Sequence, residues 1–400
     1  MASIKLKGDT SGEITISAPA VAGTTTLELP ATSSTLATQN ALGVRNLIIN
    51  GDMRIAQRGT SATGLGNGDT GLHTVDRWRF QESGAPTFEF TQTQDTDVPS
   101  GQGFSSSLKM SCTTAQGSLA TDDMLRITQI IESQNLQHLK YGTSSAESVT
   151  VSLWVKSNKT GNYNVSLYNN DYISIIGNTI TINSANTWEK KTITFVGDTG
   201  NVLDNDNGRG LWLWIALCSG TDYTGTDTSS WTDSTGIQTT LANGQTVNLA
   251  DSTSNYINIT GVQLEVGTEA TPFEHRPYDM ELARCMRYYE ETDPDGRVGL
   301  HGYIKQTNTL GRVFWNWKVR KRAAPTLSVG FVTAGLFTLR YGDSGSRNCS
   351  DSQVTLGLST IDCCTMEISI SQTMLSGYGL TCDVRGDLSG NTRLIADAEL

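Results

Sequence analysis

The sequence is poor in charged residues and in strong helix formers. Asp, Glu, Lys and Arg make up only 17% of its 400 residues. Glu, Lys and Ala are sparse beside Thr, Val, Ile and Gly, the last with 40 copies. Long helices need the first group of residues, whereas strands and tight turns use the second. The composition therefore predicts a mostly β protein, long enough for two or three domains.

Positive charge is also scarce. Lys and Arg number 29 against 40 Asp and Glu, which gives a net charge of −11 and a sequence pI near 4.9. A nucleic-acid-binding protein normally carries a basic face, and the one basic cluster here, residues 318–322, is typical of a solvated strand end. We expect no nucleic-acid partner.

Long apolar runs are missing as well. No stretch approaches the roughly 20 apolar residues that span a bilayer, so membrane insertion is not expected. The residues from Met1 to Lys7 lack the apolar segment of a secretory signal, which favours synthesis and assembly in a cytoplasm.

Motifs of common enzymes are absent from the sequence. It has no Gly-x-Ser-x-Gly, no His-Glu-x-x-His and no phosphate-binding loop, and its four histidines are scattered. The short repeating coils of a β-helical depolymerase are not present either. We predict a non-enzymatic protein. A glycosidase with paired carboxylates stays an alternative, because carboxylate spacing is set by the fold.

The seven cysteines form no pair of C-x-x-C motifs. Cys363 and Cys364 are adjacent, which is an awkward geometry for a mutual disulfide. Free thiols are the favoured interpretation, and a disulfide is the alternative.

Alternating apolar residues divide the chain into four regions. In residues 1–43, short apolar–polar alternations predict two or three hairpins with too few apolar side chains for a core of their own, so this segment is expected to pack on copies of itself or on a larger particle. Residues 44–277 contain strand-like runs separated by Asn, Gly, Asp and Ser, which predict a jelly-roll β-sandwich. Residues 123–139 fit a helix or a strand about equally. A linker helix is expected within 278–296, because Pro277 is a start signal and Leu282, Met286 and Tyr289 recur at helical spacing. A small C-terminal β domain is expected in 297–400.

Three stretches, in this order along the chain, carry a resemblance to one group of proteins. The first comprises residues 4–12 (Ile-Lys-Leu-Lys-Gly-Asp-Thr-Ser-Gly), 18–23 and 27–30. The second comprises residues 46–53 (Asn-Leu-Ile-Ile-Asn-Gly-Asp-Met), 57–59 and 76–78. The third comprises residues 259–267 (Ile-Thr-Gly-Val-Gln-Leu-Glu-Val-Gly), 271–274 and 284–289, with 321–326 and 396–400 fitting the same group. These stretches resemble, respectively, the leader, the opening of the jelly roll, and the closing strand with its linker helix in structural proteins of tailed bacteriophages.

The resemblance implies a virion-surface protein, a tail-fibre or adhesin subunit that is a homotrimer. Its residues 1–43 would contact other virion proteins of the tail or capsid. The jelly roll is also similar to carbohydrate-binding modules, which implies non-covalent binding of host surface glycans. The alternative is a structural decoration or connector protein that binds only other virion proteins, since fold does not fix function.

Aromatic side chains are the candidates for sugar contact, because an aromatic face stacks on the apolar face of a pyranose. In 149–155 and 211–217, Trp154, Trp212 and Trp214 alternate with aliphatic residues and are expected on the faces opposite the core. They either bind ligand or pack. Further candidates in or beside loops are Trp231, Tyr168, Tyr172 and Tyr223.

A structural calcium is the one cofactor that the sequence raises. In many carbohydrate-binding modules the first and last strands meet at calcium, and the resemblance places Asp52 and Glu265 there. Gly261 stands where an acidic residue would often precede the last strand. Asp204 and Asp206 lie in an Asn/Asp/Gly-rich segment with alternating oxygen ligands, but Ile215 stands where an EF-hand needs Glu, so a plain turn is the alternative.

Overall fold

The computed structural model describes residues 3–7, 13–17, 45–225, 228–233, 241–292, 298–304, 310–330, 337–341, 345–349, 354–369, 379–384 and 393–400. The chain divides into two units, Met1–Gly43 and Val44–Leu400. In the first, β1 (Ser3–Lys7) pairs antiparallel with β2 (Glu13–Ser17), with Ile4 opposite Ile16 and Leu6 opposite Ile14. This is the first of the predicted hairpins. The alternation at 27–29 lies outside the described residues.

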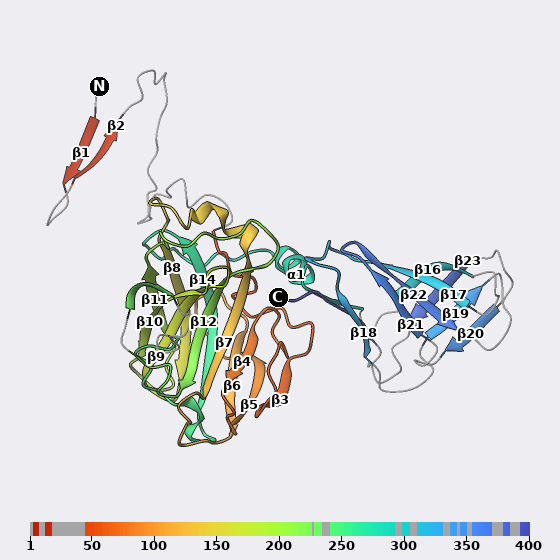
Figure 1. The fold of residues 1–400 in the computed structure, drawn as a ribbon, viewed down its shortest axis with the longest axis horizontal. Helices are drawn as coiled ribbons and strands as arrows, with labels where there is room; N and C mark the ends of the chain where they lie inside the picture. Colours follow the sequence, from red (N-terminus) through yellow and green to blue (C-terminus); the bar gives the residue numbers. More distant parts are fainter. Residues whose placement is uncertain are drawn as a thin grey trace. The chain divides into compact units, whose positions relative to one another are not determined.

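The second unit contains two six-stranded antiparallel sheets that form a sandwich (Figure 1). The β12 sheet has the order β13 (Thr228–Asp233), β10 (Ser174–Ile182), β9 (Gly161–Asn169), β12 (Arg209–Ser219), β7 (Met124–Glu132), β4 (Arg79–Ser83). The β14 sheet has the order β11 (Glu189–Phe195), β8 (Val149–Ser157), β14 (Tyr256–Val266), β6 (Ser107–Thr114), β5 (Glu89–Asp95), β3 (Ser61–Gly66). The predicted mostly β fold with a central sandwich is confirmed.

The core lies between these sheets and is built by side chains of alternate residues. Leu211, Leu213 and Ile215 of β12 are almost fully buried, as are Val151 and Leu153 of β8. Successive side chains of a strand point to opposite faces, so the residues between them lie on the outer faces of the sandwich. The hydrophobic core therefore fixes which aromatic residues point away from it.

Residues 123–139, whose sequence fits a helix or a strand equally, contain a strand followed by a short helix. Residues Met124–Glu132 form β7, and Ser133–Leu139 form the 3-10 helix η2. A second short 3-10 helix, η4, comprises Leu249–Asp251. β7 is buried along its whole length. Because both of its faces are covered, its sequence lacks the simple alternation of a half-exposed strand.

The predicted linker helix begins where expected but is shorter. Helix α1 comprises Tyr278–Met286, after which the chain returns to a strand, β15 (Tyr289–Glu291). The helical spacing that includes Tyr289 was therefore misleading. That residue is buried in a strand that pairs with β24 (Arg393–Asp397) instead.

The remaining strands form two further antiparallel sheets. A three-stranded sheet has the order β15, β24, β18 (Thr326–Gly330). A seven-stranded sheet has the order β20 (Gly345–Cys349), β19 (Phe337–Tyr341), β23 (Gly379–Val384), β16 (Val298–Ile304), β17 (Leu310–Asn316), β22 (Cys363–Ser369), β21 (Val354–Ser359). The division between residues 277 and 297 stays a prediction, since Val44–Leu400 cluster as one unit.

The residues after α1 are bonded to the outer face of the β12 sheet. The buried Glu132 of β7 accepts hydrogen bonds from Arg287 at 2.7 and 2.8 Å and from the Tyr288 hydroxyl at 2.6 Å. Burial opposes ionisation of this carboxyl, but those donors hold its pKa below the ordinary value. Near the end of the chain, Glu399 forms an ion pair with Arg77, and Leu400 is buried.

Two remaining sequence predictions concern thiols and membranes. Cys112, Cys218, Cys285, Cys363 and Cys364 are free thiols, as favoured; the side chains of the other two cysteines are outside the described set. No helix in the described part of the chain is long and apolar enough to cross a membrane.

Candidate functional site

Trp154 lies on the outer face of the β14 sheet and is only half-buried. In β8 the aliphatic residues on either side of it face the core, as the sequence predicts. Across the sheet, Trp154 is opposite Lys190 of β11 on one side and Thr260 of β14 on the other. Residues that are directly opposite in an antiparallel pair have neighbouring side chains. The indole therefore stands in a row with a lysine and a threonine.

A groove of about 410 Å³ opens over this row. Strands β8 and β11 supply its floor, and two loops supply its walls, one before β6 and one after β14. The lining residues are Gln102, Phe104, Ser152, Trp154, Lys190, Ala270, Pro272, Phe273 and His275. The volume falls in the range of small-ligand sites, and aromatic rings alternate with polar groups along the wall, as in sites that bind amphipathic ligands. We name it the Trp154 groove.

Three rings from the two loops pack together at one side of the groove. Phe104 is 5.1 Å from Phe273 and 5.2 Å from His275, and the last two are 4.9 Å apart, all between ring centroids. Such edge-to-face and tilted contacts are favourable arrangements of aromatic pairs. The cluster ties the loop before β6 to the loop after β14 and so fixes the shape of the groove.

Gly261 makes room for these rings. It has a φ of +60°, at a break of register between β14 and β8. A Cβ at this position would lie 2.5 Å from the Phe104 ring and 3.0 Å from the Trp154 ring. The residue that departs from the carbohydrate-binding-module pattern therefore has a structural role here: its missing side chain lets two rings lie against the strand.

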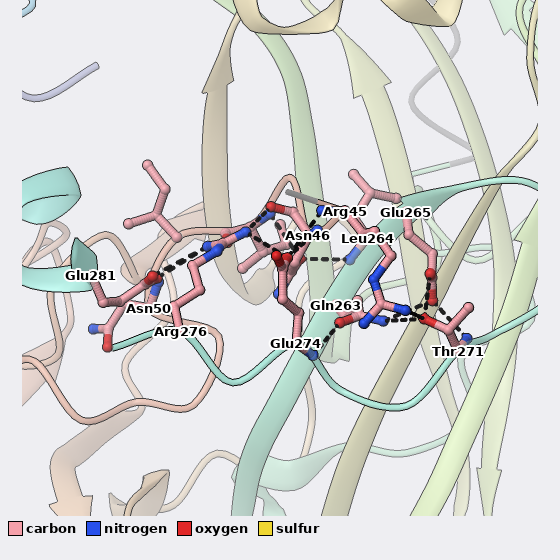
Figure 2. Close-up of polar contacts among 12 residues, drawn as sticks. Arg45, Asn46, Asn50, Gln263, Leu264, Glu265, Thr271, Glu274, Arg276 and Glu281 are labelled. Atoms are coloured by element: carbon pink, nitrogen blue, oxygen red, sulfur yellow. Dashed lines mark hydrogen bonds and ion pairs between the residues drawn. The ribbon is translucent and has the colours of Figure 1, made fainter. Parts of the chain in front are cut away.

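The loop after β14 is held by polar side chains of that strand (Figure 2). Glu265 accepts hydrogen bonds from the backbone and hydroxyl of Thr271 at 2.8 and 2.7 Å, and the Gln263 carbonyl accepts one from the Glu274 backbone at 2.8 Å. These bonds fix both ends of the segment that carries Pro272 and Phe273. The groove wall is thus positioned by the closing strand of the sandwich.

The opening of the sandwich is joined to the same place through Asn46 and Arg45. Asn46 donates to the carbonyl of Val262 at 3.1 Å and accepts from the backbone of Leu264 at 3.1 Å, so its amide replaces a missing strand partner beside β14. The guanidinium of Arg45 donates to the Thr271 hydroxyl at 2.9 Å. The first and last segments of the sandwich therefore meet beside the groove.

Arg276 is the centre of this meeting point, which we name the closure. Its buried guanidinium donates to the carbonyls of Asn46 and Ile48 and pairs with Glu274 and Glu281, each at 3.2 Å. Two carbonyls and two carboxylates thus surround one fixed positive charge, which Figure 2 shows between the labelled acids. A buried cation needs this compensation.

The motif Asn50-Gly51-Asp52 is part of the closure. Asn50 has a φ of 57°, and its side chain bonds Ile55 in both directions. The carbonyl of Gly51 accepts a hydrogen bond from Val262 at 2.9 Å. A Cβ on Gly51 would collide with the Val262 carbonyl. The glycine is required because two backbones come close.

The predicted calcium ligands do not fit a metal site. Asp52 pairs with Arg54 at 2.9 Å, and Glu265 is engaged by Thr271 and Gln263. Asp206 accepts from the backbone of Gly208 within a turn, and Asp204 is exposed. No group of three His, Cys, Asp or Glu able to hold a metal occurs among the described residues. At the closure, Arg276 already supplies the positive charge that the converging oxygens require.

Trp212 and Trp214 are packed rather than open. They lie on the outer face of the β12 sheet, as predicted, but only 8% and 5% of their surface is exposed. Tyr168 stacks on Trp214 at 4.9 Å, and Arg126 lies 4.4 Å from the Trp214 ring centroid. The cluster also contains Ile130, Ile175, Tyr288 and Leu400. Of the two interpretations left open by the sequence, packing describes these tryptophans and their neighbour Tyr168.

The other aromatic candidates are separate from the Trp154 groove. Tyr223 is 4% exposed and packs with Met124. Trp231 lies edge-on to Tyr141 at 5.7 Å and donates to the Val196 carbonyl at 2.8 Å. Tyr172 is 50% exposed in the turn between β9 and β10. Of the seven predicted residues, the structure places only Trp154 in a groove with other rings.

Sequence reasoning missed the residues that the loops contribute. Phe104, Phe273 and His275 do not belong to an alternating strand, so no periodicity marks them. The sequence Thr271-Pro272-Phe273-Glu274 had drawn attention as part of a resemblance, without a role for its ring. Loops are positioned by the scaffold, and their spatial partners cannot be deduced from spacing along the chain.

The side chains of the groove suit the binding of an amphipathic ligand, and its described lining includes no carboxylate. A half-buried indole, flanking rings and the polar side chains of Gln102, Ser152 and Lys190 can stack on a sugar ring and hydrogen-bond its hydroxyls.

Comparisons with known proteins give no family. No family model matches the sequence, and no curated protein matches it. Among solved structures, the enzymatically active domain of tailspike protein 4 of bacteriophage CBA120 is similar with 13% identity and a TM-score of 0.29. The match covers 56% of this chain and 21% of that one, so this chain spans about a fifth of the tailspike's length.

Two sugar-binding proteins are similar at a comparable level. One is TmCBM61 in complex with β-1,4-galactotriose, with 9% identity over 56% of this chain and 99% of that chain and a TM-score of 0.27. The other is a putative sugar binding protein from Bacteroides thetaiotaomicron, with 11% identity over 56% of this chain and 100% of that chain and a TM-score of 0.30. Scores this low assign neither a family nor a function to this chain.

Proposed function

We propose that this chain is a non-enzymatic adhesin that binds glycans through the Trp154 groove. The observation that carries the proposal is the partly exposed indole on a sheet, in a groove of about 410 Å³ walled by Phe104 and Phe273. Flat aromatic faces beside hydrogen-bonding side chains suit pyranose rings, which have one apolar face and hydroxyls at their edges.

The setting that we propose is the surface of a tailed-phage virion. The ordered resemblance of residues 4–12, 46–53 and 259–267 to phage structural proteins supports it. In this proposal the chain is a tail-fibre subunit in a homotrimer, and residues 1–43 contact other virion proteins. Three copies would raise the avidity of a weak single site. A stable monomer in solution would contradict the oligomeric part.

Glycan binding is tested on an array of bacterial surface glycans with the full chain. We expect binding by the unaltered protein, a loss of at least about ten-fold in Trp154→Ala, and substantial retention in Trp154→Phe, which keeps a ring. Tyr172→Ala is the matched control, because it removes an exposed aromatic residue outside the groove. Loss of binding in Tyr172→Ala but not in Trp154→Ala would contradict the proposal, because it would place the glycan site at Tyr172 and outside the groove.

The second candidate function is a structural decoration or connector protein that binds only virion proteins. The burial of Trp212 and Trp214 favours this second function, because aromatic residues on that outer face of the sandwich serve packing. Absence of binding to every host glycan, together with location of the protein on the capsid, would support this function over the adhesin.

A further inference from the structure

The charge of the Trp154 groove differs from the charge of the whole chain. The chain carries a net charge of −11. The groove, in contrast, is lined by Lys190 and His275, and none of its described lining residues is acidic. The contrast bears on which glycan the groove would accept.

The acids near the groove in sequence are engaged elsewhere. Glu189 accepts from Asn183 and Ser184 and pairs with Lys191. Glu265 is taken by Thr271. Glu274 is taken by the backbone of Asn46 and by Arg276. The exposed Glu269 precedes Ala270 but does not line the groove. These acids therefore leave Lys190 without a carboxylate partner within 4 Å in the described part of the chain.

Lys190 stands beside the stacking surface. It is exposed, and it is paired directly opposite Trp154 across β11 and β8, so both side chains rise from the same face of the sheet. A sugar ring on the indole would have its edge within reach of the flexible lysine chain. His275, on the opposite loop, adds a second side chain that can donate a hydrogen bond.

We propose that the Trp154 groove selects acidic glycans, whose sugar carboxylate lies toward Lys190. This proposal rests on the proposed glycan binding and names its ligand class: polysaccharides containing uronic or sialic acids. A charge-assisted hydrogen bond between an ammonium and a carboxylate is stronger than one between neutral groups. A neutral sugar would stack equally well but would offer the lysine only uncharged hydroxyl oxygens.

The test compares acidic polysaccharides with their carboxyl-reduced forms, which differ only at the carboxyl group. The probes are polygalacturonate, hyaluronate and oligomeric N-acetylneuraminic acid, each measured by calorimetry with the full chain. We expect at least one acidic probe to bind about five-fold or more tighter than its reduced form, since exposed ion pairs contribute on this scale. The preference should shrink as salt is added.

Two variants separate this proposal from the function on which it rests. Lys190→Gln should abolish the preference for the acidic form, because affinity for the acidic form should fall to the level of the reduced form. Trp154→Ala should weaken binding of both forms. Lys140→Gln is the matched control, an exposed lysine paired with Glu147 outside the groove. It should preserve the preference.

Each outcome decides at least one of the two proposals. Equal or tighter binding of the reduced forms would overturn acidic selection and leave glycan binding intact. A preference that survives Lys190→Gln would overturn the role of this lysine. Failure of the folded protein to bind any acidic or neutral probe would overturn glycan binding and acidic selection together.

Discussion

The two outer faces of the sandwich carry tryptophans in the same sequence pattern but use them differently. On the β14 sheet, Trp154 is half-buried beside a groove. On the β12 sheet, Trp212 and Trp214 are covered by Tyr288 and Leu400, among others. Alternation put all three side chains on outer faces. What lies over each face decides whether an indole lines a groove or belongs to a core.

The largest expected effect contrasts these two faces directly. Trp214→Ala should lower the free energy of unfolding by about 3–5 kcal/mol, because it removes a packed ring. Trp154→Ala should lower it by about 1 kcal/mol, because that ring is only partly buried at the sheet surface. Urea denaturation of both variants measures the difference. Equal losses would mean that both rings are packing residues, and the contrast between the faces would collapse.

Arg276→Met probes the closure, which supports the face of the sandwich that carries the Trp154 groove. We expect a loss of about 3–4 kcal/mol, since Glu274, Glu281 and two carbonyls would be left buried without their cation. Arg284→Met in α1 is the control, because its guanidinium is only half-buried. Similar midpoints of thermal unfolding for both variants would contradict a special role for Arg276.

Gly261→Ala sharpens the comparison by disturbing the groove from within the strand. A positive φ and the contact with Phe104 and Trp154 should together cost about 1–3 kcal/mol. Glycan binding should weaken as well, because the rings must shift. Gly267→Ala is the control: its φ is +114°, but a Cβ there meets nothing within 4 Å. If Gly267→Ala weakened binding as much, backbone strain rather than ring displacement would be responsible.

Glu132→Gln loosens the segment that covers the other face. The pKa of Glu132 is lowered in the folded protein despite burial, so its carboxylate stabilises the fold fully above about pH 4.5 and loses that effect as pH falls through the folded pKa. We expect the variant to be about 1–2 kcal/mol less stable at neutral pH and equal to the unaltered protein in acid. A difference that is independent of pH would rule out this ion pair as the cause.

The smallest expected effect concerns calcium. Because Arg276 supplies the charge at the closure, adding a chelator should leave the thermal midpoint unchanged, and adding calcium should do the same. Differential scanning calorimetry in both conditions measures this. A calcium-dependent rise in the midpoint would show that the oxygens of the closure, or those near Asp204, bind the ion after all.

The sequence by itself determined the class of the fold and the direction of many side chains. Alternation in 149–155 and 211–217 predicted strands whose tryptophans face away from the core, and Pro277 marked the beginning of α1. It could not separate helix from strand in β7, where both faces are buried and no alternation remains. It also extended the helical spacing to Tyr289, a strand residue. Local periodicity reports which residues are buried, not what buries them.

The tertiary structure alone decided which tryptophan lines a groove and which is packed. Trp154 became a groove residue because Phe104 and Phe273, 169 positions apart in the chain, meet at the groove, and Gly261 leaves room for the rings of Phe104 and Trp154. Trp212 became a packing residue because Leu400, the last residue of the unit, lies in the same hydrophobic cluster. Both outcomes are contacts between distant segments. Spacing along the sequence carries no information about such contacts, because the fold of the intervening chain creates them.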